Sequence, residues 1–225
     1  MPNFFSDIIE IMAMDDLINE LIKNGVLKTP LIIDAFRKIK REDFVLEDLR
    51  EEADINAPLP IGYGQTISQP LTVAFMLELL QPQPGDKILD IGSGSSWQTA
   101  LLAYCVGESG KVFGVERIPE LVEFGIKNVA KYNYIEKGIV KFILGDGSKK
   151  ATFDPIRDEI SNGVNKIIVA ASAQKVPQAW KEQLKIHGRI VAPIKESIWL
   201  FIKKSDKEFE ETEFPGFAFV PLIES

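Results

Sequence analysis

The chain has 225 residues, 45% of them hydrophobic and 26% charged, and its formal net charge is −7 at pH 7. That length suits one elaborated α/β domain and is short for two. The acidic balance argues against a phosphate-tracking groove over a large surface, so we expect no nucleic-acid partner. The single cysteine, Cys105, excludes a disulfide framework within the chain and is typical of a reducing compartment.

The N-terminal segment carries Asp7 and Glu10 among apolar side chains and lacks the basic start of a signal peptide. No apolar stretch approaches the roughly 18 residues that a membrane span requires. We therefore expect a cytoplasmic protein with no membrane partner, and we expect it to be a monomer.

Two helices are expected before residue 40. Apolar residues recur at helical spacing over 17–22, and Gly25 stands where a helix would stop. The second helix begins at Pro30, with Thr29 as its candidate cap. Residues 41–64 are so rich in acidic residues, proline and glycine that they predict a loop of unusual length, of the kind that holds a ligand or covers a site. A third helix is expected over 70–80.

From residue 87 onward, strand and helix patterns alternate. Strands are expected near 87–91, 111–115, 139–144, 166–171, 188–194, 197–203 and 217–222, and helices near 97–106, 119–132 and 176–186. The last two strands, joined by an acidic loop, suit an antiparallel edge. The expected fold is α/β, a doubly wound, seven-strand, mainly parallel, Rossmann-like sheet. Residues 1–225 then form one domain, with N-terminal helices and the long loop in 1–80 and the sheet in 81–225.

A nucleoside site is expected at the end of the first strand of this sheet. The strand over 87–91 opens onto a glycine turn with Gly92 and Gly94, and the next strand ends on Glu116, where a ribose diol needs acceptor oxygens. Trp97 replaces the third glycine of a dinucleotide fingerprint, and no P-loop Gly-Lys-Ser/Thr follows. A phosphate-free adenosyl ligand such as S-adenosylmethionine therefore fits better than NAD or ATP. A purely structural turn and a solvated strand end remain the alternatives.

The run Leu-Pro-Ile-Gly-Tyr-Gly-Gln-Thr-Ile-Ser-Gln-Pro over 59–70 resembles the signature loop of protein-L-isoaspartate (D-aspartate) O-methyltransferases. The resemblance continues through 88–94, 145–148, 167–172, 183–185, 188–193 and 219–222, in family order, and covers nearly the whole chain from about Asp15. It implies a class I, seven-strand methyltransferase that uses S-adenosylmethionine. Its partners would be proteins and peptides with isoaspartyl or D-aspartyl residues, whose free carboxylate it methylates to start repair.

The resemblance also implies which residues bind the cofactor. Gly92 and Gly94 would approach its amino-acid end, Glu116 would accept the ribose hydroxyls, and Asp146 with Gly147 would sit at the adenine. Without the resemblance, Asp146-Gly147 is a common turn pair. No metal ligands are expected.

On the acceptor side, the resemblance places Ser68 at the reaction. Substrate-binding positions would be Gln65, Thr66, Ile67, Pro193 and Ile194. An isoaspartyl carboxylate is already ionised at neutral pH and the sulfonium methyl is already activated, so no general base is required. Ser68 can donate one hydrogen bond to orient that carboxylate. Its structural alternative is to cap the helix that begins near Pro70.

Three residues replace glycines that are frequent in this family: Ser96 in the cofactor turn, His187, which we interpret as structural, and Lys195 near the expected acceptor pocket. Residues 148–165 also differ from the usual run, and a C-terminal Tyr-Gly-Trp stretch is missing after Ile223. Two alternatives therefore stay open. One is a methyltransferase with a different acceptor, and the other is an interaction module that binds the cofactor without catalysis or does not bind it.

Overall fold

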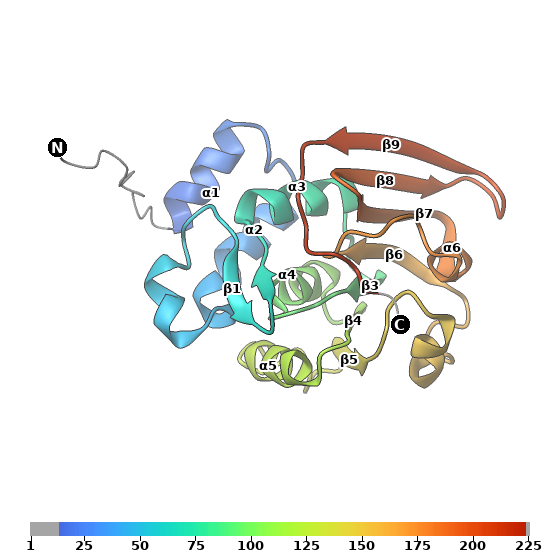
Figure 1. The fold of residues 1–225 in the computed structure, drawn as a ribbon, viewed down its shortest axis with the longest axis horizontal. Coiled ribbons are helices and arrows are strands. Elements are labelled where there is room, and N and C mark those ends of the chain that lie inside the picture. Colours follow the sequence, from blue (N-terminus) through green and yellow to red (C-terminus); the bar gives the residue numbers. More distant parts are fainter. Residues whose placement is uncertain (1–13, 224–225) are drawn as a thin grey trace.

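The computed structural model describes residues 14–223, so the acidic N-terminal residues that argued against a signal peptide lie outside it. A seven-stranded sheet of order β5-β4-β3-β6-β7-β8-β9 forms its centre (Figure 1). Its strands are β3 (Lys87–Ile91), β4 (Lys111–Glu116), β5 (Val140–Leu144), β6 (Val164–Val169), β7 (Leu184–Ile194), β8 (Ser197–Lys203) and β9 (Phe209–Pro215). Strands β3 to β7 are parallel to one another, β8 pairs antiparallel with β7, and β9 pairs antiparallel with β8. The predicted fold class is confirmed.

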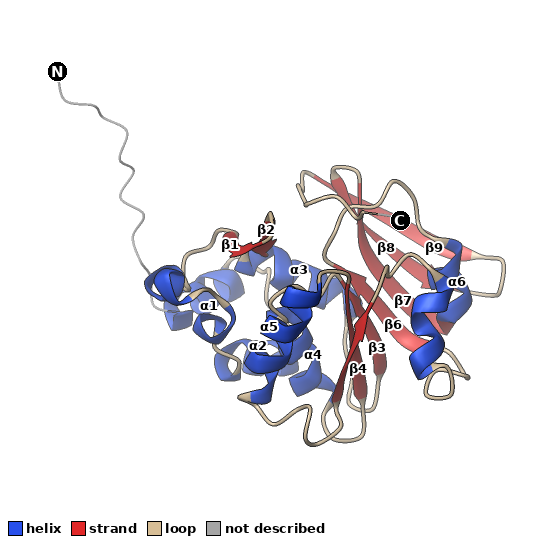
Figure 2. Cartoon of the chain, turned by 60° about the horizontal axis from the view of Figure 1, so that its bottom comes forward, coloured by secondary structure: helices blue, strands red, loops and turns tan. Residues whose placement is uncertain are grey.

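Helices cover both faces of the sheet (Figure 2). They are α1 (Met14–Lys23), α2 (Pro30–Lys38), α3 (Pro70–Leu80), α4 (Trp97–Val106), α5 (Pro119–Ala130) and α6 (Gln178–Gln183). Strand β3 shows why two cores form, because its side chains alternate. Ile88 joins the core under α1 to α5, whereas Leu89 and Ile91 join the core under α6. Apolar side chains therefore pack on both faces of the sheet.

The first two helices begin and end close to the predicted residues. Gly25 has a φ of 68°, and its N–H donates to the Ile22 carbonyl at 3.0 Å, while Val26 donates to Leu21 at 2.9 Å. That pattern ends α1, as expected for a glycine that tolerates the left-handed conformation. Thr29 precedes α2, but its hydroxyl donates to Glu78 of α3 at 2.7 Å and does not cap the helix.

The long loop expected over 41–64 is more regular than predicted. It contains the 3-10 helices η1 (Arg41–Phe44) and η2 (Glu47–Glu52), followed by a hairpin of β1 (Leu59–Gly62) and β2 (Gln65–Ile67). Tyr63 and Gly64, both with positive φ, form the two-residue turn. Positive φ at both positions is typical of the primed turns that match strand twist. Proline and glycine argued against a strand here, yet a two-stranded ribbon consists only of edges, where proline is tolerated.

The last strand was placed wrongly. The structure puts it at Phe209–Pro215, within the acidic segment that was predicted to be a loop, where it pairs with β8 along its whole length. Its glutamates are exposed because β9 is an edge strand, and charged side chains are common at sheet edges. Residues 217–222 instead cross the carboxyl end of the sheet. There the Ser172 N–H donates to Val220 at 2.8 Å and the Leu222 N–H donates to Ser172 at 2.8 Å.

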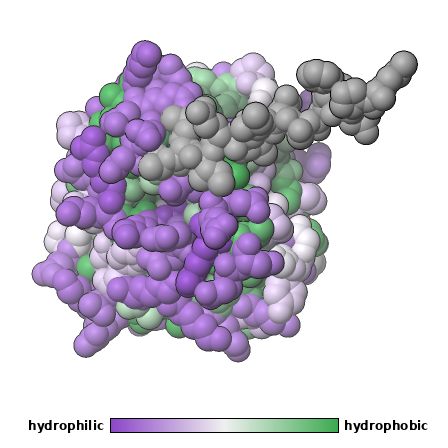
Figure 3. All heavy atoms as spheres, turned by 90° about the vertical axis from the view of Figure 1, so that its left-hand side faces the viewer, coloured by the Kyte–Doolittle hydropathy of each residue, from purple (hydrophilic) through white to green (hydrophobic). Residues whose placement is uncertain are grey.

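Two further observations concern regions that the sequence left open. Residues 148–165, which had no clear pattern, contain the 3-10 helix η3 (Lys150–Ile156). No helix within residues 14–223 combines the length and the apolar character that crossing a membrane requires. The face on the side of the N-terminal helices is mainly hydrophilic, with hydrophobic residues scattered across it (Figure 3).

Candidate functional site

A cleft lies at the carboxyl ends of β3, β4 and β6 and encloses about 910 Å³, including space that is open to solvent. Strand order reverses here, because β4 and β6 lie on opposite sides of β3. Such a switch point is where doubly wound sheets bind ligands. The β1–β2 hairpin and the C-terminal segment 220–223 form its other walls. The sites predicted for the cofactor and for the acceptor loop therefore face one common space.

The glycine turn forms the wall nearest β3. Gly92 and Gly94 have φ values of 77° and 50°, and the Gly92 N–H donates to the Val115 carbonyl at 2.8 Å. A Cβ on Gly94 would lie 3.1 Å from Cδ1 of Ile61, which belongs to the hairpin. Glycine at these positions keeps the backbone exposed to the cleft and lets the hairpin pack closely over the turn.

Glu116 ends β4 and lines the cleft with only 7% of its surface exposed. Its carboxylate accepts three backbone hydrogen bonds: Oε2 from Gly94 at 3.0 Å, and Oε1 from Arg117 at 2.7 Å and Ile118 at 3.1 Å. A carboxylate accepts about four hydrogen bonds, so Oε2 retains the capacity for a donor in the cleft. Glu116 thus joins the glycine turn to the start of α5 and presents a fixed acceptor.

Asp146 and Gly147 line the cleft at the end of β5. Asp146 Oδ1 accepts from the N–H of Ser148 at 2.9 Å and from its hydroxyl at 2.7 Å, so the pair also forms the turn that was considered as an alternative. The Gly147 carbonyl accepts from the indole of Trp180 at 2.7 Å, and a Cβ on Gly147 would lie only 2.5 Å from Ile91. The turn is therefore held rigidly against the cleft.

Ser96 does not obstruct the cleft, although it replaces a glycine of the cofactor turn. It is completely buried, has a φ of 71° and is absent from the cleft wall. Its side chain points at α5, where a Cβ on Gly125 would lie 2.2 Å from Ser96 Oγ. Gly125 thus provides the space that Ser96 needs, and the remaining cost is the left-handed backbone and a buried hydroxyl without a partner among the described residues.

We expect Gly125→Ala to lower the free energy of unfolding by about 1–3 kcal/mol, because the new methyl group would overlap Ser96 Oγ. Ser96→Gly in the same chain should restore most of that loss. Chemical denaturation of the single and double variants measures the coupling. Additive effects of the two substitutions would show that these side chains do not share the space.

Ser68 follows β2 and lines the cleft, half-buried. The alternative that it caps α3 is wrong, because the N-cap position is Gln69 and the Leu71 N–H donates to Asn56 Oδ1 at 3.1 Å. Gln65, Thr66 and Ile67 line the same wall. The hairpin therefore brings the four predicted acceptor residues of this segment to the cleft.

Pro193 and Ile194 are not brought to this cleft. The Pro193 carbonyl accepts from the Ala173 N–H at 3.0 Å, and Ile194 lines a separate hollow beside Trp199 of β8, together with Lys195. His187 is exposed in the irregular first part of β7. We therefore leave these residues out of the site, and Lys195 is not among the residues that line the cleft.

Several residues of the cleft wall were missed from the sequence. The largest group is residues 220–223, of which 220–222 had been assigned to a strand, although the family resemblance at 219–222 could have indicated a site. Gln98 also lines the wall, and it donates to the buried Asp90 at 2.7 Å, as does Thr99 at 2.6 Å. Burial raises the pKa of Asp90 to about 6. Asp90 thus fixes the first turn of α4 below the glycine turn.

Ionisable side chains are few around the cleft. Among the described residues that line it, they are Glu116, Arg117 and Asp146, so neither histidine nor lysine borders the space. Within residues 14–223, no group of histidine, cysteine and carboxylate side chains has the arrangement of a metal site. The arrangement can hold a polar, uncharged or cationic ligand and orient an acceptor.

Comparison with known proteins agrees with this geometry. Residues 12–225 match the family model described as Protein-L-isoaspartate(D-aspartate) O-methyltransferase (PCMT). A protein-L-isoaspartate O-methyltransferase of Methanopyrus kandleri is 40% identical over 94% of this chain and 91% of its own length, and one of Thermococcus onnurineus is 40% identical over 92% and 91%. A solved structure from Plasmodium falciparum, described as such an enzyme in complex with S-adenosyl-L-homocysteine, superposes with a TM-score of 0.83 at 23% identity. The superposition covers 95% of this chain and 100% of the Plasmodium falciparum chain.

Proposed function

The chain belongs to the protein-L-isoaspartate (D-aspartate) O-methyltransferase family, and we propose that it transfers a methyl group from S-adenosylmethionine to the free carboxylate of isoaspartyl residues. One observation carries this proposal. The glycine turn with Glu116 and the hairpin with Ser68 face each other across a single cleft. The acceptors would be damaged proteins and peptides, including those with D-aspartyl residues.

The residues present fit an adenosyl cofactor. Glu116 offers Oε2 to a ribose hydroxyl, the exposed backbone at Gly92 and Gly94 allows close approach, and Asp146 with Gly147 closes the far end. Ile91, Val115 and Ile118 supply apolar surface between these polar groups, suited to a flat base. The cleft wall has two carboxylates and one guanidinium, which favours a ligand that carries a positive charge.

S-adenosylmethionine, when bound, supplies a methyl group that its sulfonium sulfur already activates. The protein has to place the acceptor oxygen about 3 Å from that group and remove water from it. Ser68 donates one hydrogen bond, which orients the acceptor carboxylate without neutralising it. The hairpin and segment 220–223 enclose the acceptor and exclude water. An isoaspartyl carboxyl group, with a pKa near 4, is ionised at neutral pH, so the absence of histidine and lysine from the described cleft wall is consistent with this reaction.

We further propose a cytoplasmic monomer that acts on polypeptides and binds neither nucleic acid nor membranes. The net charge of −7 supports the absence of nucleic-acid binding, and the single, buried cysteine supports a reducing compartment. Sedimentation of the purified protein gives the oligomeric state, and a stable dimer would contradict the monomer.

Radiolabelled methyl transfer tests the proposed function. The wild-type protein should form a base-labile methyl ester on an isoaspartyl peptide and none on the same peptide with a normal aspartyl residue. Calorimetry with S-adenosylhomocysteine, run beside it, separates loss of binding from loss of turnover. Binding without any ester on the isoaspartyl peptide would overturn the assignment of the acceptor.

Asp146→Ala should raise the dissociation constant for S-adenosylhomocysteine about tenfold, because the variant removes an acceptor at the adenine end and loosens the turn at Gly147. Asp146→Asn keeps an oxygen that accepts from Ser148, so it preserves the turn while it changes the group offered to the adenine. Equal affinity of all three proteins in calorimetry would contradict the placement of the adenine at this turn.

A further inference from the structure

A buried arginine ties the acceptor hairpin to the rest of the domain. Arg41, the first residue of η1, is completely buried. Within residues 14–223, its guanidinium donates to backbone carbonyls alone. Nη1 donates to Ala53 at 2.7 Å and Ile55 at 3.2 Å, and Nη2 donates to Ala57 at 2.8 Å and Ser68 at 3.1 Å. One side chain thus holds both ends of the segment that contains the hairpin.

Burial of this guanidinium costs free energy, because the charged group loses its hydration. No carboxylate of residues 14–223 lies within ion-pair distance of it, and Nε has no acceptor there. Burial lowers the pKa of Arg41 to about 10, and the nearby negative charge of Asp54 opposes that shift only in part. A buried cation without a carboxylate partner contributes little to stability compared with an apolar residue of similar size. We therefore look for the role of Arg41 in the backbone segments that it holds in place.

Arg41 also contacts the cofactor side of the cleft. Its Cζ lies 5.5 Å from the ring centroid of Trp97, and the indole of Trp97 donates to the Ile39 carbonyl at 3.3 Å. Trp97 is the first residue of α4, directly after the glycine turn, and it lines the cleft. The stacked pair therefore joins the backbone of Ser68 to the wall beside the cofactor turn.

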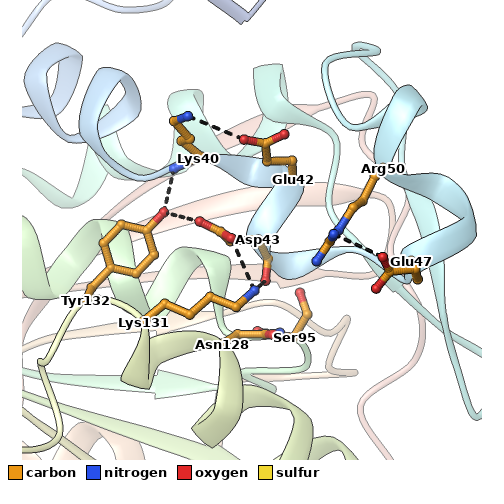
Figure 4. Close-up of polar contacts among 9 residues, drawn as sticks. All are labelled: Lys40, Glu42, Asp43, Glu47, Arg50, Ser95, Asn128, Lys131 and Tyr132. Atoms are coloured by element: carbon orange, nitrogen blue, oxygen red, sulfur yellow. Dashed lines mark hydrogen bonds and ion pairs between the residues drawn. The ribbon is translucent and has the colours of Figure 1, made fainter.

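The 3-10 helix η1, which carries Arg41, is also held in place. Asp43 of η1 accepts from the Tyr132 hydroxyl at 2.7 Å and from Lys131 Nζ at 3.2 Å, both just after α5 (Figure 4). On α5 itself, Asn128 donates to the Ser95 carbonyl in the glycine turn at 3.1 Å. Because α5 holds η1 and the glycine turn together, the distance between Arg41 and the turn is set by a rigid helix.

We propose that Arg41 is a positioning residue of the methyl transfer, which holds Ser68 at a fixed distance from the cofactor turn. This inference rests on the function proposed above. It separates the roles of two walls of the cleft. Cofactor affinity depends on Glu116 and the glycine turn, whereas the rate of transfer depends on where Arg41 holds the backbone of Ser68.

The test compares Arg41→Met and Arg41→Lys with Lys203→Met. Lys203 is the control, because it is a buried cation on β8, away from the cleft, that donates to the carbonyls of Lys181 and Leu184. It differs from Arg41 in its ion pair with the exposed Asp206 at 3.6 Å. We expect Arg41→Met to lower kcat about 10- to 100-fold, with a dissociation constant for S-adenosylhomocysteine within about threefold of wild type. Arg41→Lys should be intermediate, since an ammonium group cannot stack and serve both ends of the segment. Lys203→Met should leave kcat unchanged.

Two measurements keep a positioning role distinct from general destabilisation. The stoichiometry in calorimetry gives the folded, binding-competent fraction by which kcat is corrected. Amide hydrogen exchange over residues 57–68 should accelerate in both Arg41 variants and stay at the wild-type rate in Lys203→Met.

Either of two results would overturn the inference. One is amide hydrogen exchange over residues 57–68 at the wild-type rate in the Arg41 variants. The other is a corrected kcat equal to that of wild type in folded Arg41→Lys and Arg41→Met. If Arg41→Met does not fold, Arg41→Lys decides by the same two measurements. If the wild-type protein leaves the isoaspartyl peptide unmethylated, the proposed function is refuted. The amide exchange rates would still show whether Arg41 holds residues 57–68 in place.

Discussion

Glu116→Ala should weaken the binding of S-adenosylhomocysteine about 100-fold, which corresponds to roughly 2.7 kcal/mol. The substitution removes the acceptor proposed for the ribose and leaves the N–H groups of Gly94, Arg117 and Ile118 without their carboxylate. Hydrogen bonds to charged groups contribute about 1.5–3 kcal/mol each, and the glycine turn also loses its connection to α5. Calorimetry with S-adenosylhomocysteine measures the effect directly.

Two variants serve as controls for Glu116. Glu116→Gln keeps one carbonyl oxygen and should lose less affinity than Glu116→Ala. Glu123→Ala removes an exposed carboxylate from α5, with the same change in net charge, and should bind like wild type. Equal loss in Glu123→Ala would indicate a general effect of charge, and unchanged affinity in Glu116→Ala would refute the ribose site.

Ser68→Ala should lower kcat on an isoaspartyl peptide about 10- to 100-fold and leave the affinity for S-adenosylhomocysteine near that of wild type. The variant removes the single hydroxyl that we assign to orienting the acceptor, while the Ser68 carbonyl and its bond from Arg41 remain. Stability should hardly change, because Ser68 does not cap α3.

Steady-state kinetics with radiolabelled cofactor check this prediction. Ser68→Thr keeps a hydroxyl and should retain more activity than Ser68→Ala. The dependence of kcat on pH should keep its shape in both variants between about pH 6 and pH 8, since no proton transfer by the protein is involved. Turnover of Ser68→Ala at the wild-type rate would remove Ser68 from the reaction.

Much of the sheet could be predicted because parallel strands are buried on both faces and alternate with helices. The pattern placed β3, β4 and β8 within a residue of their observed ends, and it put Gly92, Gly94 and Glu116 at one edge. These residues share an edge because they lie at the carboxyl ends of parallel strands, and the pattern indicates where those strands end.

The errors arose where tertiary structure overrides local composition. Strand β9 tolerates acidic residues because it is an edge strand that pairs only with β8, and β1 tolerates proline because it pairs only with β2. The space that Gly125 leaves for Ser96 joins residues 29 positions apart, and nothing in the local sequence marks Arg41 as buried. Such pairings depend on how α5 and η1 pack on α4, which periodicity does not encode.

A crystal structure with S-adenosylhomocysteine and an isoaspartyl peptide tests the central claim most directly. We expect the ribose at Glu116, the adenine beside Asp146 and Gly147, and the isoaspartyl carboxylate within hydrogen-bond distance of Ser68 Oγ. A cofactor outside this cleft, or a peptide whose carboxylate lies away from the hairpin, would contradict the account.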